Sequence, residues 1–325
     1  MQNKKILITG GAGFIGSHLA DKLIGCGNNI TAIDNLSTGA KSNIEHLLGN
    51  SRFTFIEDSI LNKKIMDTLS ANCDVIYHLA AAVGVRLIVE DPVHTIETNI
   101  FGTEIVLQAA NKYKRPLFIA STSEVYGKND NVPFREEDDT VMGCTQMPRW
   151  SYACSKAIDE FLALAYHKQY GLPVVIGRFF NTIGPRQSGQ YGMVVPRFIK
   201  AAIANEQIHI YGDGKQSRCF SNVADVIEAA TRLMNEPKAL GGVFNIGSTD
   251  EITIDALADL VIELASSKSK KEYISYEKAY GANFDDMLRR LPSTDKLERT
   301  IGFKPETKLT QTLEIIINAF KAIRK

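Results

Sequence analysis

The first half of the chain alternates short apolar runs with longer stretches whose apolar residues recur at helical spacing, and this alternation restricts the possible folds most strongly. The short runs predict buried strands at Ile6–Thr9, Ile30–Ile33, Phe53–Ile56, Val75–His78, Leu117–Ala120 and Val174–Arg178. The longer stretches predict helices at Phe14–Leu23, Thr95–Asn111 and Ser151–Gln169. Strands that alternate with helices in this way pair in parallel and need helices on both faces. We therefore expect an α/β fold built on a doubly wound parallel sheet.

The pattern changes after Asn181. Glycine and proline punctuate Gly184–Gly192 and Gly212–Gly214, and helical patterns become fewer. A chain of 325 residues suits one large or two modest domains. We expect a nucleotide-binding domain over residues 1–180 and a smaller C-terminal, substrate-binding α/β domain over residues 181–325, interleaved with the first.

Composition excludes several classes of protein. Lys and Arg together number 37, as do Asp and Glu, whereas a nucleic-acid binder normally carries a basic excess or stripe. No apolar run reaches the length of about 18 residues that suggests a membrane span. The five cysteines are scattered without a CxxC pair, which favours a reducing compartment over a disulfide framework or a zinc site. We expect a cytoplasmic protein with no metal, nucleic-acid or membrane partner.

A glycine-rich turn joins the first predicted strand to the first predicted helix. In this turn Gly10 and Gly11 follow the strand, Gly11 allows the tight bend, and Gly13 lets the backbone approach a pyrophosphate. Gly16 permits close packing of the helix on the sheet, and Phe14 and Ile15 begin that helix, whose free N–H groups favour phosphate. A strand before and a helix after the glycines predict a dinucleotide site of the Rossmann type.

Acidic residues follow the next two predicted strands. Asp34, with Asn35 beside it, ends the second strand, where a carboxylate accepts hydrogen bonds from a ribose 2′-hydroxyl and repels a 2′-phosphate. The alternative is a solvated turn aspartate, but the position directly after the strand favours NAD over NADP. Asp58 and Ser59 follow the third strand, where they are expected to meet the adenine.

Tyr152 and Lys156 stand four residues apart on a predicted helix, which places both side chains on one face. A tyrosine with its ordinary pKa near 10 is a poor base at neutral pH, and a neighbouring ammonium together with an oxidised nicotinamide favours the phenolate. The spacing alone is common by chance. The segment Ser121–Gly127 adds weight, because it follows the fifth strand at the sheet edge where ligands gather.

Taken together, these motifs resemble the extended short-chain dehydrogenase/reductase family of nucleotide-sugar epimerases, dehydratases and decarboxylases. The resemblance covers nearly the whole chain. It rests on the glycine turn, His78–Ala81, Thr98-Asn99, Thr122–Gly127, Tyr152/Lys156, Arg178–Asn181, Gly184–Arg186, Tyr211–Gly214 and Arg289–Pro292. The order in which they occur is far more specific than any one of them.

The resemblance implies a mechanism and a set of roles. Tyr152 takes the proton from the sugar 4-hydroxyl as hydride passes to NAD, Thr122 hydrogen-bonds the same oxygen, and Lys156 holds the ribose and biases the tyrosine. It also places Ala80 at the cofactor. The nucleotide diphosphate is held by Asn181, Arg218 and Arg290, and the nucleoside by Tyr211, with uridine as the base.

Three reactions remain open from a 4-keto sugar, and Glu124 is the informative residue. Simple 4-epimerases usually carry a small residue there, and glucose-type 4,6-dehydratases carry Asp-Glu where this chain has Ser123-Glu124. The runs Pro148–Tyr152, Lys215–Phe220 and Arg290–Ser293 resemble UDP-glucuronate decarboxylases, whereas Val83–Arg86 resembles epimerases. We expect a UDP-glucuronate decarboxylase, with a UDP-sugar 4-epimerase and a 4,6-dehydratase, for example of UDP-N-acetylglucosamine, as alternatives. Inversion at C5 also remains open. In the decarboxylase Glu124 orients the C4/C5 region or acts as the base at C5.

Two further expectations concern the protein as a whole. Some proteins of this fold lose catalysis and only bind NAD, but they typically lack the tyrosine or lysine that this chain keeps. The predicted helices Thr95–Asn111 and Ser151–Gln169 carry broad apolar faces, which in this family usually meet their symmetry mates. We therefore expect an enzyme that forms a homodimer with an isologous contact.

Overall fold

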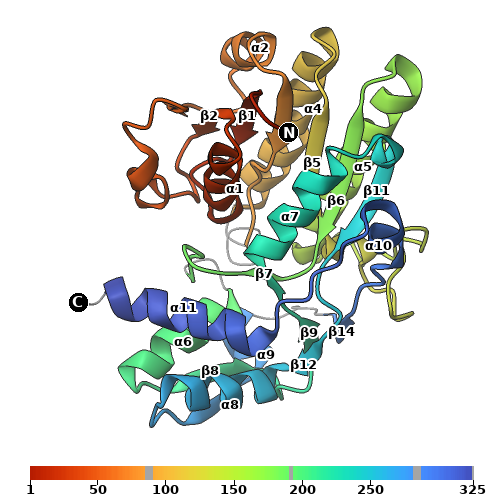
Figure 1. Cartoon of the computed structure of the whole chain (residues 1–325). Coiled ribbons are helices and arrows are strands. Elements are labelled where there is room, and N and C mark those ends of the chain that lie inside the picture. Colours follow the sequence, from red (N-terminus) through yellow and green to blue (C-terminus); the bar gives the residue numbers. More distant parts are fainter. Residues whose placement is uncertain (85–90, 190–192, 281–286, 324–325) are drawn as a thin grey trace.

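A computed structural model describes residues 1–84, 91–189, 193–280 and 287–323. Its centre is a sheet of seven parallel strands in the order β11-β6-β5-β4-β1-β2-β3 (Figure 1). The strands are β1 (Lys5–Thr9), β2 (Asn29–Asp34), β3 (Phe53–Glu57), β4 (Val75–His78), β5 (Leu117–Thr122), β6 (Val174–Phe179) and β11 (Gly242–Ile246). The strand order reverses between β1 and β4, which is the point where such sheets bind dinucleotides.

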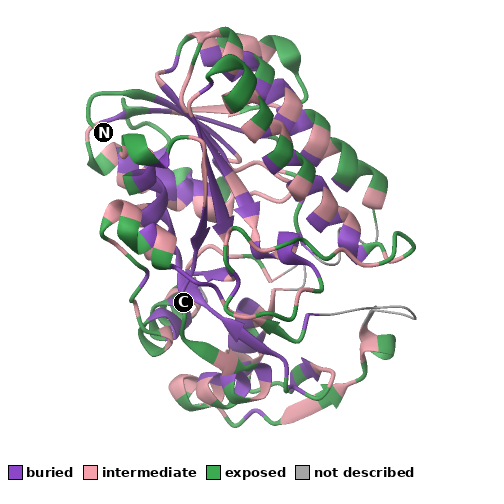
Figure 2. Ribbon diagram, turned by 90° about the vertical axis from the view of Figure 1, so that its right-hand side faces the viewer, coloured by how far each residue is buried: buried purple, intermediate pink, exposed green. Residues whose placement is uncertain are grey.

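Helices cover both faces of the sheet, as the alternation of strands and helices predicts. Along β1, Ile6 and Ile8 pack with α1 (Phe14–Gly25) and α7 (Val223–Leu233), whereas Leu7 packs on the opposite face. That opposite face carries α2 (Lys63–Ala71), α4 (Pro92–Lys112) and α5 (Arg149–Tyr170). Figure 2 shows the buried strands enclosed between helices whose outer surfaces are exposed. The doubly wound α/β fold is confirmed.

A second, smaller core lies below the carboxyl edge of the sheet. It is formed by α6 (Val194–Ala204), α8 (Ile254–Ala265) and α11 (Leu309–Ile323), which pack around Phe198, Leu257 and Ile316. Short strands complete this part, in the pairs β8 (Ile208–Tyr211) with β13 (Lys271–Ile274), and β7 (Thr182–Ile183) with β10 (Ser221–Asn222). A three-stranded sheet joins β12 (Glu251–Thr253), β9 (Ser217–Cys219) and β14 (Arg289–Arg290). The remaining helices are α9 (Tyr276–Tyr280) and α10 (Asp295–Ile301), with 3-10 turns at Lys41–Asn43, Glu45–Leu47, Ser123–Tyr126 (η3) and Pro237–Ala239.

The chain crosses between the two parts more than once. Strand β11 and helices α7 and α10 follow residue 181, yet β11 completes the large sheet and the helices pack against its core. The expected interleaving of the two domains corresponds to β11, α7 and α10. The division between residues 180 and 181 stays a prediction. The expectation of few helices after Asn181 was wrong, since α6 to α11 all lie there. They are short amphipathic helices separated by glycine and proline loops, which obscure helical periodicity.

Within the described ranges, no helix is long and apolar enough to cross a membrane. The same residues contain no cluster of three or more potential metal ligands. All five cysteines are free thiols, two of them, Cys73 and Cys219, buried.

Candidate active site

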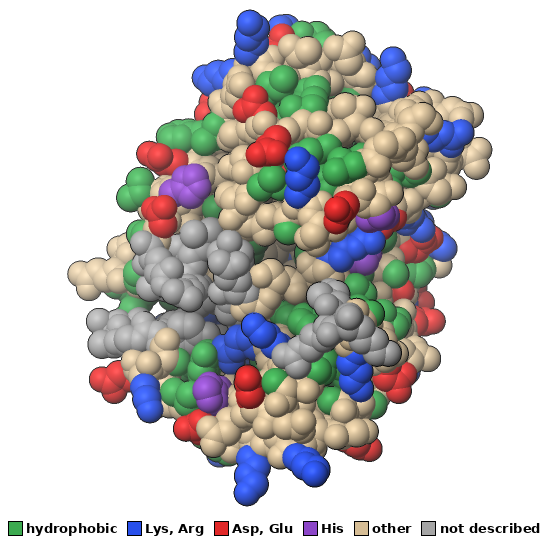
Figure 3. Space-filling view, turned by 90° about the vertical axis from the view of Figure 1, so that its left-hand side faces the viewer, with side chains coloured by type: hydrophobic (Ala, Val, Ile, Leu, Met, Phe, Trp, Pro, Cys, Tyr) green, Lys and Arg blue, Asp and Glu red, His purple; other side chains and the backbone are tan. Residues whose placement is uncertain are grey.

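A cavity of about 460 Å³ opens at the carboxyl edge of the sheet, between the large sheet and the smaller part. The molecular surface is hollowed between these two parts, and Lys and Arg side chains gather at the hollow (Figure 3). Every predicted site residue lines this cavity except Lys156. The topology explains the convergence of the residues that follow the strands of the large sheet, because the ends of parallel strands meet at one edge. Tyr211, Arg218 and Arg290 come instead from short strands of the smaller part.

The glycine turn forms one end of the cavity. Gly10 has a φ of +71°, a left-handed conformation that a side chain rarely adopts. A Cβ at Gly16 would lie 2.1 Å from the carbonyl oxygen of Gly10, so only glycine allows α1 to start this close to β1. Phe14 and Ile15, at the start of α1, line the cavity, and Ala80 lines it from beyond β4. The turn is thus a bare-backbone cradle that fits a pyrophosphate.

Asp34 lies at the end of β2 and is almost fully buried. Its carboxylate accepts hydrogen bonds from the backbone N–H groups of Ala12 at 3.0 Å and Leu36 at 2.8 Å. Burial raises the pKa of Asp34, and these N–H groups oppose the rise. Asn35 lines the cavity beside Asp34, and Asp58 and Ser59 line it after β3. This arrangement suits the hydroxyl groups of an adenosine.

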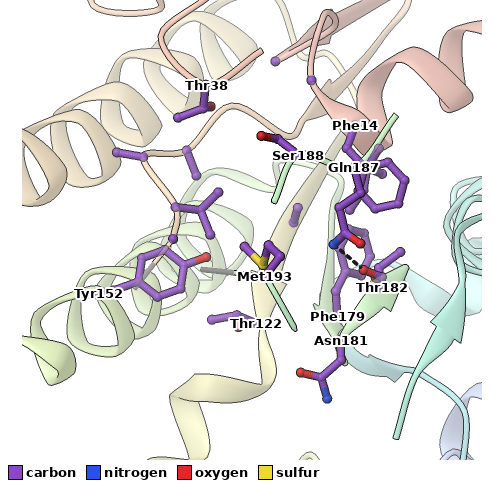
Figure 4. A pocket seen from close by; sticks show the side chains of 18 of the residues that line it. Phe14, Thr38, Thr122, Tyr152, Phe179, Asn181, Thr182, Gln187, Ser188 and Met193 are labelled. Carbon is purple, nitrogen blue, oxygen red and sulfur yellow. Dashed lines mark hydrogen bonds between the residues drawn. The ribbon is translucent and has the colours of Figure 1, made fainter. Parts of the chain in front are cut away.

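Tyr152 and Thr122 lie next to each other in the middle of the cavity. Figure 4 shows the Tyr152 hydroxyl, from α5, directed into the space beside Thr122 at the end of β5, with Asn181 and Gln187 on the opposite side. Burial raises the pKa of Tyr152 above its usual value, and the Glu124 and Asp159 charges raise it further, while a hydrogen bond with Thr122 lowers it. In the unliganded protein Tyr152 is therefore a neutral phenol at neutral pH.

Lys156 is buried and is not one of the residues that line the cavity. Its side chain is 3% exposed, and its ammonium contacts the Asp159 carboxylate at 2.8 Å, one turn further along α5. The predicted role of Lys156 in binding the ribose stays a prediction.

Glu124, in η3 directly after β5, lies between two arginines. Its Oε1 atom is 3.4 Å from Nη1 of Arg290 in β14 and 3.8 Å from Nη2 of Arg149 at the start of α5. All three side chains are largely buried and line the cavity beside Tyr152. Arg290 thus meets a carboxylate in this structure, and its predicted contact with a diphosphate stays a prediction. The cluster places two cations and one anion beside the reacting end of the cavity.

The lower part of the cavity holds the residues predicted to bind a nucleotide diphosphate. Asn181 donates to the Cys219 carbonyl at 2.9 Å, and the buried Arg218 donates to the Ser217 carbonyl at 2.8 Å. The Arg197 guanidinium lies 4.1 Å from the centre of the Tyr211 ring. An aromatic ring covered by a cation, next to a second arginine, can accept a planar base and phosphate oxygens.

Sequence reasoning missed two residues of this cavity that carry charge. Arg149 precedes Tyr152 by one helical turn, a spacing that places both on one face of α5 and was visible in the sequence. Arg197 on α6 meets Tyr211 only through the packing of α6 on β8, which no local pattern indicates.

The chain is similar to known proteins over almost its whole length. Residues 7–316 match the family model described as GDP-mannose 4,6 dehydratase. UDP-N-acetyl-alpha-D-glucosaminuronate decarboxylase from Bacillus cytotoxicus is 45% identical over 98% of both chains. UDP-glucuronic acid decarboxylase 1 from Xenopus tropicalis is 36% identical over 98% of this chain and 72% of its own.

Solved structures give the same picture at the level of the fold. The structure of UDP-glucuronic acid 4-epimerase from Bacillus cereus, in complex with UDP-glucuronic acid and NAD, superposes with a TM-score of 0.88 at 30% identity. It covers 98% of this chain and 99% of its own. Proteins similar to this chain thus include both decarboxylases and an epimerase.

Proposed function

The chain belongs to the extended short-chain dehydrogenase/reductase family of nucleotide-sugar-modifying enzymes, and on that premise we propose that it decarboxylates a UDP-linked uronic acid with the help of NAD. The observation that carries the proposal is the Arg149–Glu124–Arg290 cluster beside Tyr152 and Thr122. Two buried guanidinium groups at the reacting end suit a substrate whose C6 is a carboxylate rather than a neutral alcohol.

The residues at the upper end of the cavity fit NAD. The cradle at Gly10, Gly13 and Gly16 would hold the pyrophosphate, and Asp34 and Asp58 would hold the adenosine. A buried carboxylate at the end of β2 disfavours the 2′-phosphate of NADP. When bound, NAD supplies the reversible hydride acceptor for C4 of the sugar.

The chain's own residues then act on the sugar oxygen. Tyr152, once deprotonated, takes the proton of the C4 hydroxyl, and Thr122 hydrogen-bonds that oxygen. The C4 ketone makes the C6 carboxylate a β-keto acid. Its C5–C6 bond breaks with release of carbon dioxide, the electron pair passes to C5 and O4, and Tyr152 donates to the O4 anion. A proton from solvent then adds to C5 while the enol returns its O4 proton to Tyr152. Return of the hydride to C4, with that Tyr152 proton passing to O4, would restore the C4 alcohol and the oxidised cofactor, so that hydrogen replaces the carboxylate in the product.

Glu124 has a defined part in this scheme. Arg149 and Arg290 alone would bind the C6 carboxylate tightly, and tight binding of the ground state slows its loss. Glu124 shares both guanidinium groups, so it weakens that hold while it orients the C4/C5 region. We infer that this balance distinguishes a decarboxylating site from one that only binds a uronate.

The favoured substrate is UDP-N-acetylglucosaminuronate, with UDP-glucuronate second. Support comes from the identity of 45% with a decarboxylase of the former and 36% with one of the latter. A UDP-sugar 4-epimerase is the second candidate, because the Tyr152–Thr122 pair alone suffices for C4 chemistry and the overlaid Bacillus cereus protein is an epimerase. Ser123 in place of the usual aspartate disfavours a 4,6-dehydratase.

The purified protein with added NAD is expected to remove 44 mass units, about the mass of CO₂, from one of the two UDP-uronates, because the β-keto acid decarboxylates readily. Mass spectrometry and proton NMR of the products check this. UDP-glucose and UDP-N-acetylglucosamine, which lack the carboxylate, serve as control substrates.

Substitution of Arg149 by Met is expected to raise KM for the uronate more than it changes kcat.

Other outcomes would assign a different reaction. An unchanged mass with a new anomeric signal means epimerisation, and a loss of about 18 mass units means dehydration, with Glu124 as the base at C5. Turnover of none of the four sugars by NAD-loaded protein contradicts the proposal.

We also propose that the protein is a cytoplasmic homodimer. Large apolar side chains are exposed on the two adjacent helices α4 and α5, namely Val93, Ile96, Phe101, Ile158 and Phe161, the last of them 71% exposed. Exposed apolar patches of this kind often mark an interface between proteins. A two-fold axis next to α4 and α5 would cover both helices with their copies.

Substitution of Phe161 by Glu is expected to convert the dimer into a monomer at micromolar concentration, since it places a charge in the apolar contact. Light scattering coupled to size-exclusion chromatography measures the mass. Substitution of Ile315 by Glu, at a half-exposed site on α11, is the matched control and should leave the dimer intact. A monomeric wild-type protein would contradict the proposal.

A further inference from the structure

A buried ion pair, Lys156 with Asp159, follows Tyr152 along α5. Lys156 and Asp159 are spaced by three residues on α5, and their side chains are 3% and 1% exposed. Their charged atoms are 2.8 Å apart. Taking two charges out of water is costly, and apolar side chains of similar size usually stabilise a core as well or better. Stability alone therefore does not account for the pair.

The pair stands at the end of a row of buried polar side chains that crosses the sheet. Thr9 at the end of β1 contacts Nδ1 of His78 at 2.8 Å, and Nε2 of His78 contacts the Thr103 hydroxyl on α4 at 3.0 Å. Burial raises the pKa of Asp159, and the Lys156 ammonium and a hydrogen bond from the Thr103 hydroxyl oppose that rise. Strands β1 and β4 and helices α4 and α5 are thus joined behind the site.

The row supplies Lys156 with a single counter-charge. Burial and the Lys156 charge lower the pKa of His78 to about 3, so this histidine is neutral. Glu160, the next carboxylate on α5, is held by Arg178 at 2.7 Å. Glu124 in η3 lies with Arg149 and Arg290 on the cavity side of Tyr152. Among the described residues that face it, Asp159 is the carboxylate that neutralises Lys156.

We propose that Asp159 is a positioning residue, which holds one N–H of the Lys156 ammonium and leaves its other two donors for the vicinal hydroxyls of the nicotinamide ribose. An ammonium has three donors on a flexible four-carbon stem, so one fixed contact restricts where the other two point. The inference rests on the proposed use of NAD, but not on which sugar is the substrate.

Substitution of Asp159 by Asn tests the proposal by the affinity for NAD. Calorimetric titration of the cofactor-free protein is expected to show a Kd for NAD raised about tenfold, the scale of one lost charge-assisted hydrogen bond. A buried ammonium without a counter-charge gives up its proton more readily. The Kd of the variant should therefore rise more steeply with pH than that of the wild type.

A double-mutant cycle with Lys156→Met separates positioning from general damage. In the Met background, D159N is expected to have no further effect on NAD affinity, because the residue that Asp159 positions is gone. Substitution of Asp67 by Asn is the matched control. It breaks another Asp–Lys contact, of 2.7 Å with Lys112, on the exposed surface, and should change neither the Kd nor its pH dependence.

Several results would overturn the proposal. These are a D159N protein that binds NAD like the wild type at every pH, or an equal loss of affinity in both backgrounds. If D159N does not fold, Thr103→Val provides the second test, since it removes a hydroxyl that supports Asp159. A Kd unchanged in this variant would also overturn it. Weaker NAD binding by D159N in a protein that converts no UDP-uronate would support the positioning role while the proposed reaction fails.

Discussion

Replacing Tyr152 by Phe is expected to lower kcat about 10³-fold, within the range of about 10²- to 10⁴-fold that one positioned acid–base group usually contributes. The phenol is the buried acid–base group that points into the middle of the cavity, and the Thr122 hydroxyl beside it has no basic form near neutral pH. NAD binding should change little, because the Lys156 ammonium is held by Asp159 and does not depend on the Tyr152 hydroxyl. Steady-state kinetics with the accepted UDP-sugar and titration with NAD check both parts.

Turnover should depend on pH, because Tyr152 must lose its proton before it can act as the base. Burial and the Glu124 and Asp159 charges raise the pKa of Tyr152, so the phenolate is scarce in the resting protein. Positive charge brought by the oxidised cofactor lowers that pKa, and wild-type turnover should fall as the pH drops below it. The residual turnover of the Phe variant should lack this acid limb.

A second tyrosine on the same helix provides the control. Tyr170 is half-exposed at the end of α5, and Tyr170→Phe should leave kcat and its pH profile unchanged. Full turnover by Y152F would remove the proposed base from the mechanism.

Much of the sheet could be predicted because local patterns determine it. Six short apolar runs match β1 to β6 to within two residues at either end, and the glycine turn and Asp34 lie where the strand order reverses. Strand β11 escaped prediction because Gly242–Ile246 is a brief apolar run far along the chain. Its place beside β6 depends on the crossing through α7.

The ion pairs and protonation states of the site were harder to predict than the residues that form it. Spacing placed Tyr152 and Lys156 on one face of α5, but it could not show that Asp159 neutralises the lysine or that burial keeps the tyrosine protonated. Glu124 and Arg290 are 166 residues apart in the chain, and they meet because β14 pairs with β9 and the residues that follow β14 bond to Phe134. Contacts of this kind arise from packing, on which local sequence carries no information.

A buried ion pair between Arg178 and Glu160 supports the end of β5, where Thr122 lies. Arg178 on β6 donates to both carboxylate oxygens of Glu160 on α5, with a shortest contact of 2.7 Å, and both side chains are 7% exposed. Ser121, the neighbour of Thr122, also donates to Glu160. The Arg178 guanidinium lies 4.7 Å from the centre of the Tyr126 ring in η3. This buried pair therefore fixes β5, α5 and η3 relative to one another.

Replacing Arg178 by Met is expected to lower the free energy of unfolding by about 3–5 kcal/mol, because it leaves the Glu160 charge buried without its partner. Urea unfolding of the cofactor-free protein measures the loss. The double variant R178M/E160Q, which removes both charges, should be more stable than R178M alone. If R178M and the double variant unfold at the same urea concentration, the uncompensated charge is not the cause.

The chain contains its own control for burial. Arg289 binds Glu251 with the same two-point geometry and a shortest contact of 2.7 Å, but its side chain is 52% exposed. Substitution of Arg289 by Met should cost less than about 1 kcal/mol, because water solvates the remaining carboxylate. The two pairs thus share chemistry and distance and differ in solvent access. A similar loss of stability in both variants would mean that the geometry of the contact, rather than its burial, sets the strength of the pair beneath Thr122.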